Sequence, residues 1–294
     1  MSFINRSDSI ALDDVVIAYS NPNDMKPIYI QKDGVYTNRH GTFRHNDLIG
    51  KKWGTKAGCA KNAGFIFLLY PTPELWTMVL PHRTQILYQP DISLISTFLK
   101  LEPGVNMIEA GTGSGSFSHS IARTIAPNGK LFTFEYHEER VSKATNEFKK
   151  HGYGDIIKIT HRDVCKDGFG LENQVQAVFL DLPSPWEALP SAKVAFSTSH
   201  IGRICCFSPC IEQVQRTCAK LEELKFTEIQ MFEVLSRPHE FRKVEAFDIP
   251  TDATSIQKKR KLTENDPGVY TSRIATQVRG HTSYLTFATL LPDI

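Results

Sequence analysis

Several features of membrane, secreted and zinc-binding proteins are missing from this 294-residue sequence. No run of about eighteen apolar residues occurs, so the sequence predicts no membrane-spanning helix. The opening segment MSFINRSDSIALDD has no hydrophobic core of the kind that a signal peptide needs. The six cysteines form no Cys-x-x-Cys pair and no cysteine–histidine group with zinc spacing, which favours reduced thiols in an intracellular protein. We therefore expect no membrane association and no metal site.

The composition is that of an ordinary globular protein, with 41% hydrophobic and 10% aromatic residues. A chain of this length forms one large domain or two unequal ones. The first seventy residues differ from the rest, because short apolar alternations at 14–19, 27–31 and 64–70 are separated by turn residues. This pattern predicts a small β-barrel-like domain over residues 1–72. A Pro-Thr-Pro sequence then marks the boundary with a second domain over residues 73–294.

The N-terminal region is also basic. Between residues 26 and 61 there are eight Lys or Arg and two Asp, a local net charge of +6 in a chain that carries only +2. A basic stripe attracts a phosphate backbone, so Arg39, His40 and Arg44 are candidate RNA contacts. A solvated charged face without a ligand is the alternative and is at least as common.

A glycine turn lies between a predicted strand and a predicted helix. The apolar run 105–108 suits a buried parallel strand, and Phe117, Ile121 and Ile125 recur at helical spacing. Between them stand Gly111, Gly113 and Gly115, with Glu109 two residues before the first glycine. Glycines let a ligand approach the backbone closely, and the helix N-terminus offers free N–H groups to it.

The spacing of these glycines distinguishes between two classes of cofactor. The NAD fingerprint G-x-G-x-x-G requires a third glycine where this chain has Ser116 or Ser118. G-x-G-x-G with an acid two residues earlier is instead typical of S-adenosylmethionine methyltransferases. The turn therefore indicates S-adenosylmethionine as the cofactor.

Carboxylates follow the next three predicted strands. Glu135 ends the second strand, where it can accept the ribose hydroxyls of the cofactor. Asp163 follows the third strand, where it can accept an adenine amine. Asp181 ends the fourth. Each alone is more often a turn residue or a helix cap, but three at one sheet edge indicate a cofactor site.

Asp181 begins the segment DLPSPW, whose prolines restrict the backbone and so fix the position of the carboxylate. If adenine N1 attacks a sulfonium methyl group, positive charge moves onto the purine. A carboxylate that accepts a hydrogen bond from the N6 amine stabilises that charge, and no general base is needed. Trp186 and Tyr88 are candidate stacking partners for a flipped base, although a core aromatic is an equal alternative for Trp186.

After residue 100, strand-like and helix-like segments alternate, which predicts a parallel sheet with helices on both faces. Segments near Val234 and at 284–290 are expected to close the sheet as an antiparallel hairpin. We thus predict an α/β fold: a Rossmann-like class I methyltransferase sheet with helices on both faces, preceded by a small N-terminal β-barrel-like domain.

The chain resembles the catalytic subunits of eukaryotic tRNA (adenine-58-N1)-methyltransferase and, more distantly, their bacterial and archaeal homotetrameric relatives. The resemblance lies in PTPELWTMVLPHRTQILY (71–88), EAGTGSGSFSHSIARTIAP (109–127), DLPSPWEA (181–188), FSPCIEQVQRTC (207–218) and GHTSYLTFAT (280–289). It implies methyl transfer from S-adenosylmethionine, with S-adenosylhomocysteine as product, to N1 of an adenine in the tRNA T-loop. Messenger RNA sites that mimic the T-loop are a further implied substrate.

The resemblance also implies roles for single residues. Asp181 is expected to contact the target base with Tyr88 nearby, so these two are the expected catalytic residues. The expected cofactor-binding residues are Leu87, Ala110, Gly111, Thr112, Gly113, Ser114, Gly115, Ser116, Glu135, Arg140, Asp163, Val164 and Asp181. The expected RNA-binding residues are Arg39, His40, Arg44, Arg83, Gln85, Pro183, Ser184, Ser208 and Pro209.

The family implies a partner as well: a catalytically silent homologue, two pairs of which form a heterotetramer that holds tRNA. The complete glycine turn and Asp181 argue against this chain being the silent subunit. Two alternatives stay open, a non-catalytic RNA-binding subunit and a methyltransferase acting on a protein or a small molecule.

Residues 249–279 form a polar insertion without apolar periodicity. It contains the basic run 258–261, which predicts a nuclear-import signal. The nuclear setting of relatives favours this interpretation over a solvated insertion or an RNA-contacting loop. We therefore expect the protein in the nucleus.

Overall fold

The computed structural model describes residue 3 and residues 7–59, 64–81, 83–244, 269–274 and 282–292. The chain divides into two compact units, residues 1–233 with 283–294, and residues 234–282. The predicted domain boundary at residue 72 therefore lies inside the first unit. Among the described helices, none combines the length and the apolar character needed to cross a bilayer.

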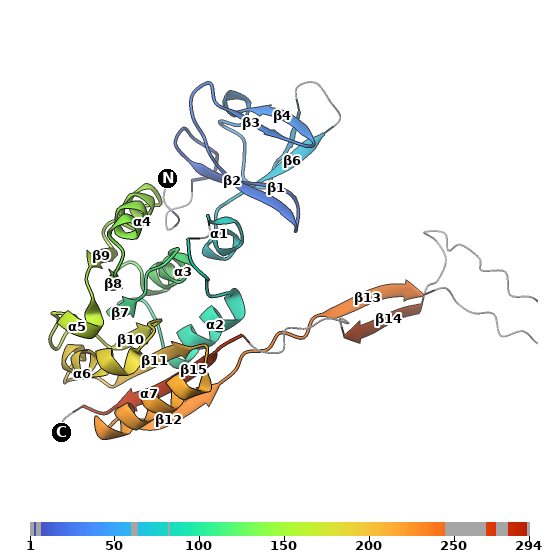
Figure 1. Cartoon of the computed structure of the whole chain (residues 1–294). Helices are drawn as coiled ribbons and strands as arrows, with labels where there is room; N and C mark the ends of the chain where they lie inside the picture. Colours follow the sequence, from blue (N-terminus) through green and yellow to red (C-terminus); the bar gives the residue numbers. More distant parts are fainter. Residues whose placement is uncertain are drawn as a thin grey trace, which may run out of the picture. The chain divides into compact units, whose positions relative to one another are not determined.

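The N-terminal part is built from antiparallel strands, as predicted (Figure 1). A sheet of order β2-β1-β6-β5 comprises β1 (Val15–Asn21), β2 (Asp24–Tyr29), β5 (Lys56–Gly58) and β6 (Phe65–Leu69). A separate hairpin consists of β3 (Val35–Asn38) and β4 (Gly41–Arg44), followed by a 3-10 turn, His45–Asp47. Val16, Ile66 and Phe43 belong to one buried core, so the hairpin and the sheet fold as one body.

The larger part holds a seven-stranded sheet of order β12-β15-β11-β10-β7-β8-β9. The strands are β7 (Met107–Ala110), β8 (Leu131–Glu135), β9 (Ile157–His161), β10 (Ala177–Leu180), β11 (Gly202–Ser208), β12 (Thr227–Phe232) and β15 (Tyr284–Leu290). Only β15 runs antiparallel to its neighbours. The first of the two closing strands, β12, ends at Phe232, slightly before the predicted position near Val234. The strand order reverses between β7 and β10, where open α/β sheets bind their ligands.

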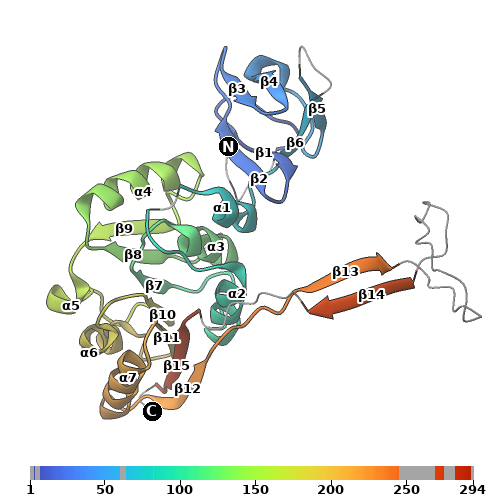
Figure 2. The same cartoon turned by 45° about the vertical axis from the view of Figure 1, so that its right-hand side comes forward.

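Helices cover both faces of this sheet, which confirms the predicted architecture (Figure 2). The helices α1 (Pro73–Val79), α2 (Gln89–Phe98), α3 (Ser116–Ile125) and α4 (Glu138–Lys150) lie toward one face. The helices α5 (Val164–Asp167), α6 (Pro185–Ala195) and α7 (Ile211–Glu223) lie toward the other. The opposite directions of the crossovers from β7 and β10 separate the two groups, because such connections are right-handed.

The second unit contains a hairpin that the sequence did not reveal. Strand β13 (His239–Val244) pairs antiparallel with β14 (Val269–Ile274), and the latter lies within the segment predicted to be a polar insertion. β14 reads VYTSRI, with Ser272 between Tyr270 and Ile274 on one face, and so short an apolar pattern does not predict a strand. The basic run 258–261 lies outside the described residues.

Candidate active site

The glycine turn connects β7 to α3 and takes a conformation that side chains oppose. Gly111, Gly113 and Gly115 have φ angles of +96°, +54° and +76°. A Cβ atom on Gly111 would lie 2.3 Å from the backbone oxygen of Asp181, and one on Gly113 would lie 2.7 Å from Thr84 Oγ1. The turn therefore needs glycine both for its backbone angles and for its close packing.

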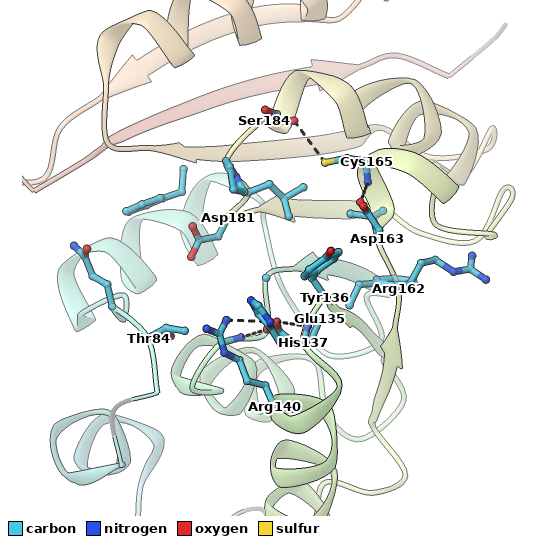
Figure 3. Close-up of a pocket in the computed structure, with 18 of the residues that line it drawn as sticks. Thr84, Glu135, Tyr136, His137, Arg140, Arg162, Asp163, Cys165, Asp181 and Ser184 are labelled. Atoms are coloured by element: carbon cyan, nitrogen blue, oxygen red, sulfur yellow. Dashed lines mark hydrogen bonds and ion pairs between the residues drawn. The ribbon is translucent and has the colours of Figure 1, made fainter.

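A cavity of about 760 Å³ opens beside this turn, at the carboxyl ends of β7, β8, β9 and β10. Its volume lies within the range of small-molecule sites, about 300–1,000 Å³. Figure 3 shows Glu135, Asp163 and Asp181 arranged around it, each from a different strand end. The predicted cofactor residues that line it are Leu87, Gly111, Gly113, Glu135, Arg140, Asp163, Val164 and Asp181.

Glu135 links the turn to the beginning of α4. Its Oε2 accepts a hydrogen bond from the backbone N–H of Gly113 at 2.9 Å, and its Oε1 accepts one from the N–H of His137 at 3.0 Å. Arg140 Nη1 lies 3.5 Å from the same Oε1 (Figure 3). The side chain is buried and fixed from three sides, yet a carboxylate offers about four acceptor positions. Glu135 therefore has capacity left for a ligand hydroxyl.

Asp163 caps α5, the structural role that strand-end aspartates often play. Its Oδ1 accepts hydrogen bonds from the backbone N–H groups of Cys165 and Lys166 at 3.2 and 3.3 Å. These two bonds occupy one carboxylate oxygen and fix its direction. The other oxygen is available for a donor on a ligand in the cavity, because Asp163 also lines that cavity.

Asp181 stands directly after β10 and is tied to the turn. Its backbone N–H donates to the Ala110 oxygen at 2.9 Å. Burial, with a further contribution from the Glu135 carboxylate, raises the pKa of Asp181 to about 6. The following loop is held by Gln213 on α7, whose Nε2 donates to the Pro183 oxygen at 2.9 Å. The carboxylate is thus fixed in the cavity by backbone contacts on both sides.

The charge of the cavity favours a cationic ligand. Besides Asp181, Glu135 and Asp163, Glu187 lines this cavity, and a fifth carboxyl group, that of Glu109, lies behind the turn. It is fully buried and accepts a hydrogen bond from Ser118 Oγ at 2.7 Å, and burial raises its pKa to about 7. Arg140 and Arg162 line the cavity too, so the four lining carboxyl groups outnumber the two guanidinium groups. This excess of acids attracts positive charge and repels phosphate. A nucleic-acid ligand would accordingly reach this cavity with a base rather than with its backbone.

Other predicted cofactor residues lie behind the main cavity. Thr112, Ser114, Gly115 and Ser116 line a smaller hollow of about 20 Å³ that shares Leu87, Gly111, Gly113 and Asp181 with the main one. Ala110 is fully buried in β7. Tyr88, an expected catalytic residue, is the N-cap of α2 and 43% exposed, and it does not line either hollow.

Of the expected RNA-binding residues, Gln85, Pro183, Ser184 and Pro209 line the cavity. Two others are corrected. The side chain of Ser208 is fully buried in β11, so it cannot contact an RNA in this structure. The side chain of Arg83 forms a largely buried ion pair with Glu147 on α4, so its guanidinium is engaged inside the protein.

The three predicted RNA contacts of the N-terminal domain lie on its β3-β4 hairpin, with Arg39 and His40 in the turn and Arg44 at the opposite end. Arg39 and Arg44 are exposed, and His40 is half-buried. Arg39 Nε lies 3.2 Å from Asp24 Oδ2, and His40 Nε2 lies 3.8 Å from the same oxygen. Asp24 therefore offsets part of the positive charge that the sequence predicted for this surface.

Several residues that line the cavity were not foreseen. Thr84 packs against Gly113, and Tyr136 and His137 follow Glu135 directly. Tyr136 is 64% exposed, which places an aromatic ring beside the acid expected to hold the ribose. Adjacency to Glu135 is the only sequence signal for these two. Trp186 is half-buried and does not line the cavity. The guanidinium carbon of Arg216 lies over its ring, 5.3 Å from the ring centre.

Known proteins with similar sequences share one description. A profile of the family described as "tRNA methyltransferase complex GCD14 subunit" matches residues 64–290. The chain is 42% identical to the tRNA (adenine(58)-N(1))-methyltransferase catalytic subunit TRM61 of Candida albicans, over 99% of both chains. It is also 42% identical to the corresponding catalytic subunit of Dictyostelium discoideum, again over 99% of both. The Schizosaccharomyces pombe subunit is 44% identical over 89% of this chain and 74% of its own length.

Solved structures share the fold. An S-adenosylmethionine-dependent O-methyltransferase from Thermotoga maritima superposes with a TM-score of 0.76 and 28% identity, covering 97% of this chain and 95% of its own. The tRNA (m1A58) methyltransferase TrmI from Aquifex aeolicus superposes with a TM-score of 0.70 at 22% identity, covering 96% and 98%. Both likenesses extend over the N-terminal domain as well as the larger sheet.

Proposed function

The chain belongs to the family of GCD14 subunits of the tRNA methyltransferase complex, and we propose that it is the catalytic subunit that methylates N1 of adenine 58 in tRNA. The methyl donor is S-adenosylmethionine. The observation that carries this proposal is the position of Asp181, at a strand end in a cavity that also contains Glu135 and Asp163. A silent homologue would have no need to keep all three.

The site fits S-adenosylmethionine on its own geometry. The turn is a cradle that a Cβ at Gly111 or Gly113 would fill, and the acids around it suit a cation. Glu135 is placed to accept the ribose hydroxyls, Asp163 to accept the adenine amine, and the turn to hold the methionine part. The cofactor, when bound, supplies an electrophilic methyl group. The likeness to an O-methyltransferase shows that the fold alone does not choose the acceptor atom.

Asp181 acts on the target adenine by orientation and charge. Its carboxylate accepts a hydrogen bond from the N6 amine and so directs N1 toward the methyl group. As N1 gains a bond, the purine gains positive charge, which the nearby carboxylate stabilises. Because N1 of neutral adenine carries no proton, Asp181 does not serve as a base. The stiff Asp-Leu-Pro-Ser-Pro loop and its bond to Gln213 hold the carboxylate in place during the reaction.

The direct test is the identity of the modified nucleotide. Bulk tRNA is incubated with the chain, its partner subunit and labelled S-adenosylmethionine, and the modified position is mapped. Methylation at N1 of adenine 58 supports the proposal. Methyl transfer only to protein or to a small molecule would favour a methyltransferase with a different substrate. Absence of cofactor binding would favour a non-catalytic RNA-binding subunit.

The reaction should depend on the ionisation of Asp181. The ionised carboxylate accepts the N6 hydrogen bond and carries the negative charge that offsets the positive charge on the purine. The protonated carboxyl group has no such charge. Since its pKa is raised to about 6, kcat/KM measured at low concentrations of both substrates should fall as the pH drops through about 6. The Asp181→Asn variant, which has no carboxylate to titrate, should lack this limb. A flat wild-type profile between pH 5 and 8 would contradict the role assigned to Asp181.

The exposed hairpin supports the proposal that a homologous, non-catalytic subunit pairs with this chain. In the register of β13 and β14, Phe241, Tyr270 and Ile274 lie on the same face. Their exposed fractions are 75%, 70% and 50%. A two-stranded hairpin is marginally stable on its own, so an apolar face of this size is best explained by a partner that covers it. Two such pairs would form the heterotetramer implied by the family.

Charge on this face should prevent the pairing. The double variant Phe241→Asp/Tyr270→Asp is expected to lose association with the partner subunit in size-exclusion chromatography with light scattering, while cofactor binding is unchanged. Thr271→Asp provides the control, because this residue lies on the opposite face of the same strand. Normal assembly by the double variant would exclude the hairpin as the contact.

Two further parts of the proposal concern RNA and location. Arg39 and Arg44 are exposed and so are suited to phosphate contacts. T-loop-like sites in messenger RNA present the same base and are included in the proposed substrates. The basic run 258–261 supports a nuclear location, which fusion of this segment to a cytosolic reporter would test.

A further inference from the structure

A chain of hydrogen-bonded side chains connects the N-terminal domain to the glycine turn. It runs from Tyr29 on β2 through His151, which directly follows α4, to His119 on α3. Tyr29 Oη lies 3.4 Å from His151 Nε2, and His151 Nδ1 lies 2.8 Å from His119 Nε2. His119 Nδ1 lies 2.6 Å from the backbone oxygen of Gly115. Both histidines are fully buried.

The carbonyl group of Gly115 fixes every proton in this chain. Because a carbonyl oxygen only accepts, His119 Nδ1 carries the hydrogen. In the neutral ring, His119 Nε2 is then an acceptor and requires the hydrogen of His151 Nδ1. His151 Nε2 is an acceptor for the same reason and takes the hydroxyl hydrogen of Tyr29. All three bonds therefore point from the N-terminal domain toward the turn.

The ionisation states agree with this order. Burial lowers the pKa of His119 to about 4 and, together with the neighbouring His119, that of His151 to about 2. Burial raises the pKa of Tyr29 to about 12, so its hydroxyl stays a donor. The other charged groups near these rings are Arg83, Glu147 and Lys150. At neutral pH the chain is uncharged and has one arrangement of protons.

Aromatic packing holds the rings in place. Phe3 stacks on His151 with ring centres 4.5 Å apart, and its backbone N–H donates to the His151 oxygen at 2.9 Å. The edge of Trp76 meets the His151 ring at 4.6 Å. Rotation of His151 away from its two hydrogen-bond partners would break these contacts as well.

The last turn of α4 also holds the other wall of the cofactor site. Glu147, one turn before His151, pairs with Arg83. The backbone N–H groups of Arg83 and Thr84 both donate to Ser114 Oγ, at 2.8 and 3.1 Å. One helix end thus supports both the glycine turn and the segment that packs over it.

We propose that His119 and His151 are positioning residues that hold the glycine turn in its cofactor-binding conformation, with Tyr29 making the N-terminal domain part of that support. This inference rests on the proposed function, because it names the turn as the seat of S-adenosylmethionine. Gly115, the residue held by His119, is in the left-handed region and is the N-cap of α3. A turn of three left-handed glycines is conformationally free unless its neighbours fix it.

A metal ion is the competing explanation for this cluster. His119, Glu147 and His151 offer three ligand atoms within 4.8 Å of one another. A metal there would need the Glu147 carboxylate, which already pairs with the guanidinium of Arg83. It would also replace the proton between the two imidazoles. In the hydrogen-bond chain, by contrast, each of the four ring nitrogens of His119 and His151 has a hydrogen-bond partner in the structure.

The test uses His151→Leu in the full-length chain. Leucine keeps much of the volume but leaves His119 Nε2 buried without a donor. We expect S-adenosylhomocysteine to bind about tenfold more weakly by calorimetry, the scale at which a lost buried partner shows. In the ligand-free chain, amide hydrogens of residues 111–116 should exchange faster. Neither readout depends on methyl transfer.

His151→Asn separates the hydrogen bond from mere packing. The asparagine amide can take the place of Nδ1–H, so affinity should return to within about twofold of wild type. Tyr29→Phe, which removes only the longest bond, should have an intermediate effect. Leu221→Ala is the control: it opens the core under α7, lowers stability and should leave affinity unchanged.

The outcomes are distinct. If wild type binds S-adenosylhomocysteine and His151→Leu binds it equally well, the positioning role is wrong while the proposed function stands. Failure of wild type to bind overturns the proposed function itself. An asparagine variant no better than leucine, or a loss of affinity in Leu221→Ala as large as in His151→Leu, assigns the effect to packing. If the purified wild-type protein contains stoichiometric zinc, the cluster is a metal site and the proposed hydrogen-bond chain is wrong.

Discussion

Replacing Asp181 with alanine is expected to reduce methyl transfer to tRNA by at least about a hundredfold, the usual cost of removing a fixed group that stabilises transition-state charge. The change removes both the acceptor for the N6 amine and the negative charge beside the purine. It should leave the cofactor contacts at Glu135 and Asp163 in place. Single-turnover rates with saturating RNA measure the effect, and calorimetry with S-adenosylhomocysteine checks that the site is still formed.

Asp181→Asn refines this result because it keeps the shape of the side chain. Its rate should lie close to that of the alanine variant, since an amide can accept from N6 but carries no charge. Asp167→Asn, on the exposed end of α5, is the matched control and should retain wild-type rates. Wild-type turnover by Asp181→Ala in the assembled complex would refute the role assigned here.

Asp181→Asn should also raise the free energy of unfolding of the protein at neutral pH. The folded-state pKa of Asp181 lies above the ordinary value of 3.8, so the folded chain binds its proton more tightly than the unfolded chain does. This carboxyl group therefore opposes folding increasingly as the pH rises from about 4 to about 6. The penalty is fully present above about pH 6 and vanishes below about pH 4. Asp181→Asn should melt at a higher temperature than wild type at pH 7 to 8, with no gain near pH 4. Opposite effects on rate and stability are typical of residues kept for function.

Gly111→Ala is expected to abolish cofactor binding and activity together. The added Cβ would lie 2.3 Å from the Asp181 backbone oxygen, closer than any real contact. Relief requires the turn and the Asp181 loop to separate, and the N–H···O bond from Asp181 to Ala110 opposes that. The φ angle of +96° adds backbone strain of about 1–2 kcal/mol for a residue other than glycine.

Gly104→Ala separates the clash from the strain. Gly104 has a φ angle of +99°, almost that of Gly111, but a Cβ there would have no atom within 4 Å. This variant should lose a similar amount of stability from strain alone and should bind S-adenosylhomocysteine normally. Binding by Gly111→Ala at wild-type affinity would mean that the turn and the loop are not the close-packed pair described above.

The parts of the site that the sequence predicted are those set by strand ends. Gly111, Glu135, Asp163 and Asp181 each follow an apolar run, and parallel strands bring such positions to one edge whatever the details of packing. The parallel sheet with helices on both faces follows from the alternation of strand-like and helix-like segments. These features depend on short stretches of sequence, so they could be predicted from the sequence.

Contacts between distant segments could not be predicted in this way. Arg83 looked like a free cation, but its partner Glu147 is 64 residues away. Ser208 lies at the end of β11, and only its pairing with β15 decides that it is buried. Gln213 holds the loop at Pro183, and His151 joins Tyr29 to His119, through hydrogen bonds to distant segments that no spacing reveals. Strand β14 is defined by its partner β13 and not by its own composition.

The position of the hairpin between β12 and β15 has a consequence for how this protein can vary. These strands are neighbours in the sheet, yet the first ends at Phe232 and the second begins at Tyr284. The entropy of closing a long loop rises slowly, by about 0.6 kcal/mol for each doubling of its length. Insertions or deletions here should scarcely change the stability of the catalytic sheet. Selection can therefore change the length and sequence of this segment without disturbing the cavity at the carboxyl ends of β7, β8, β9 and β10.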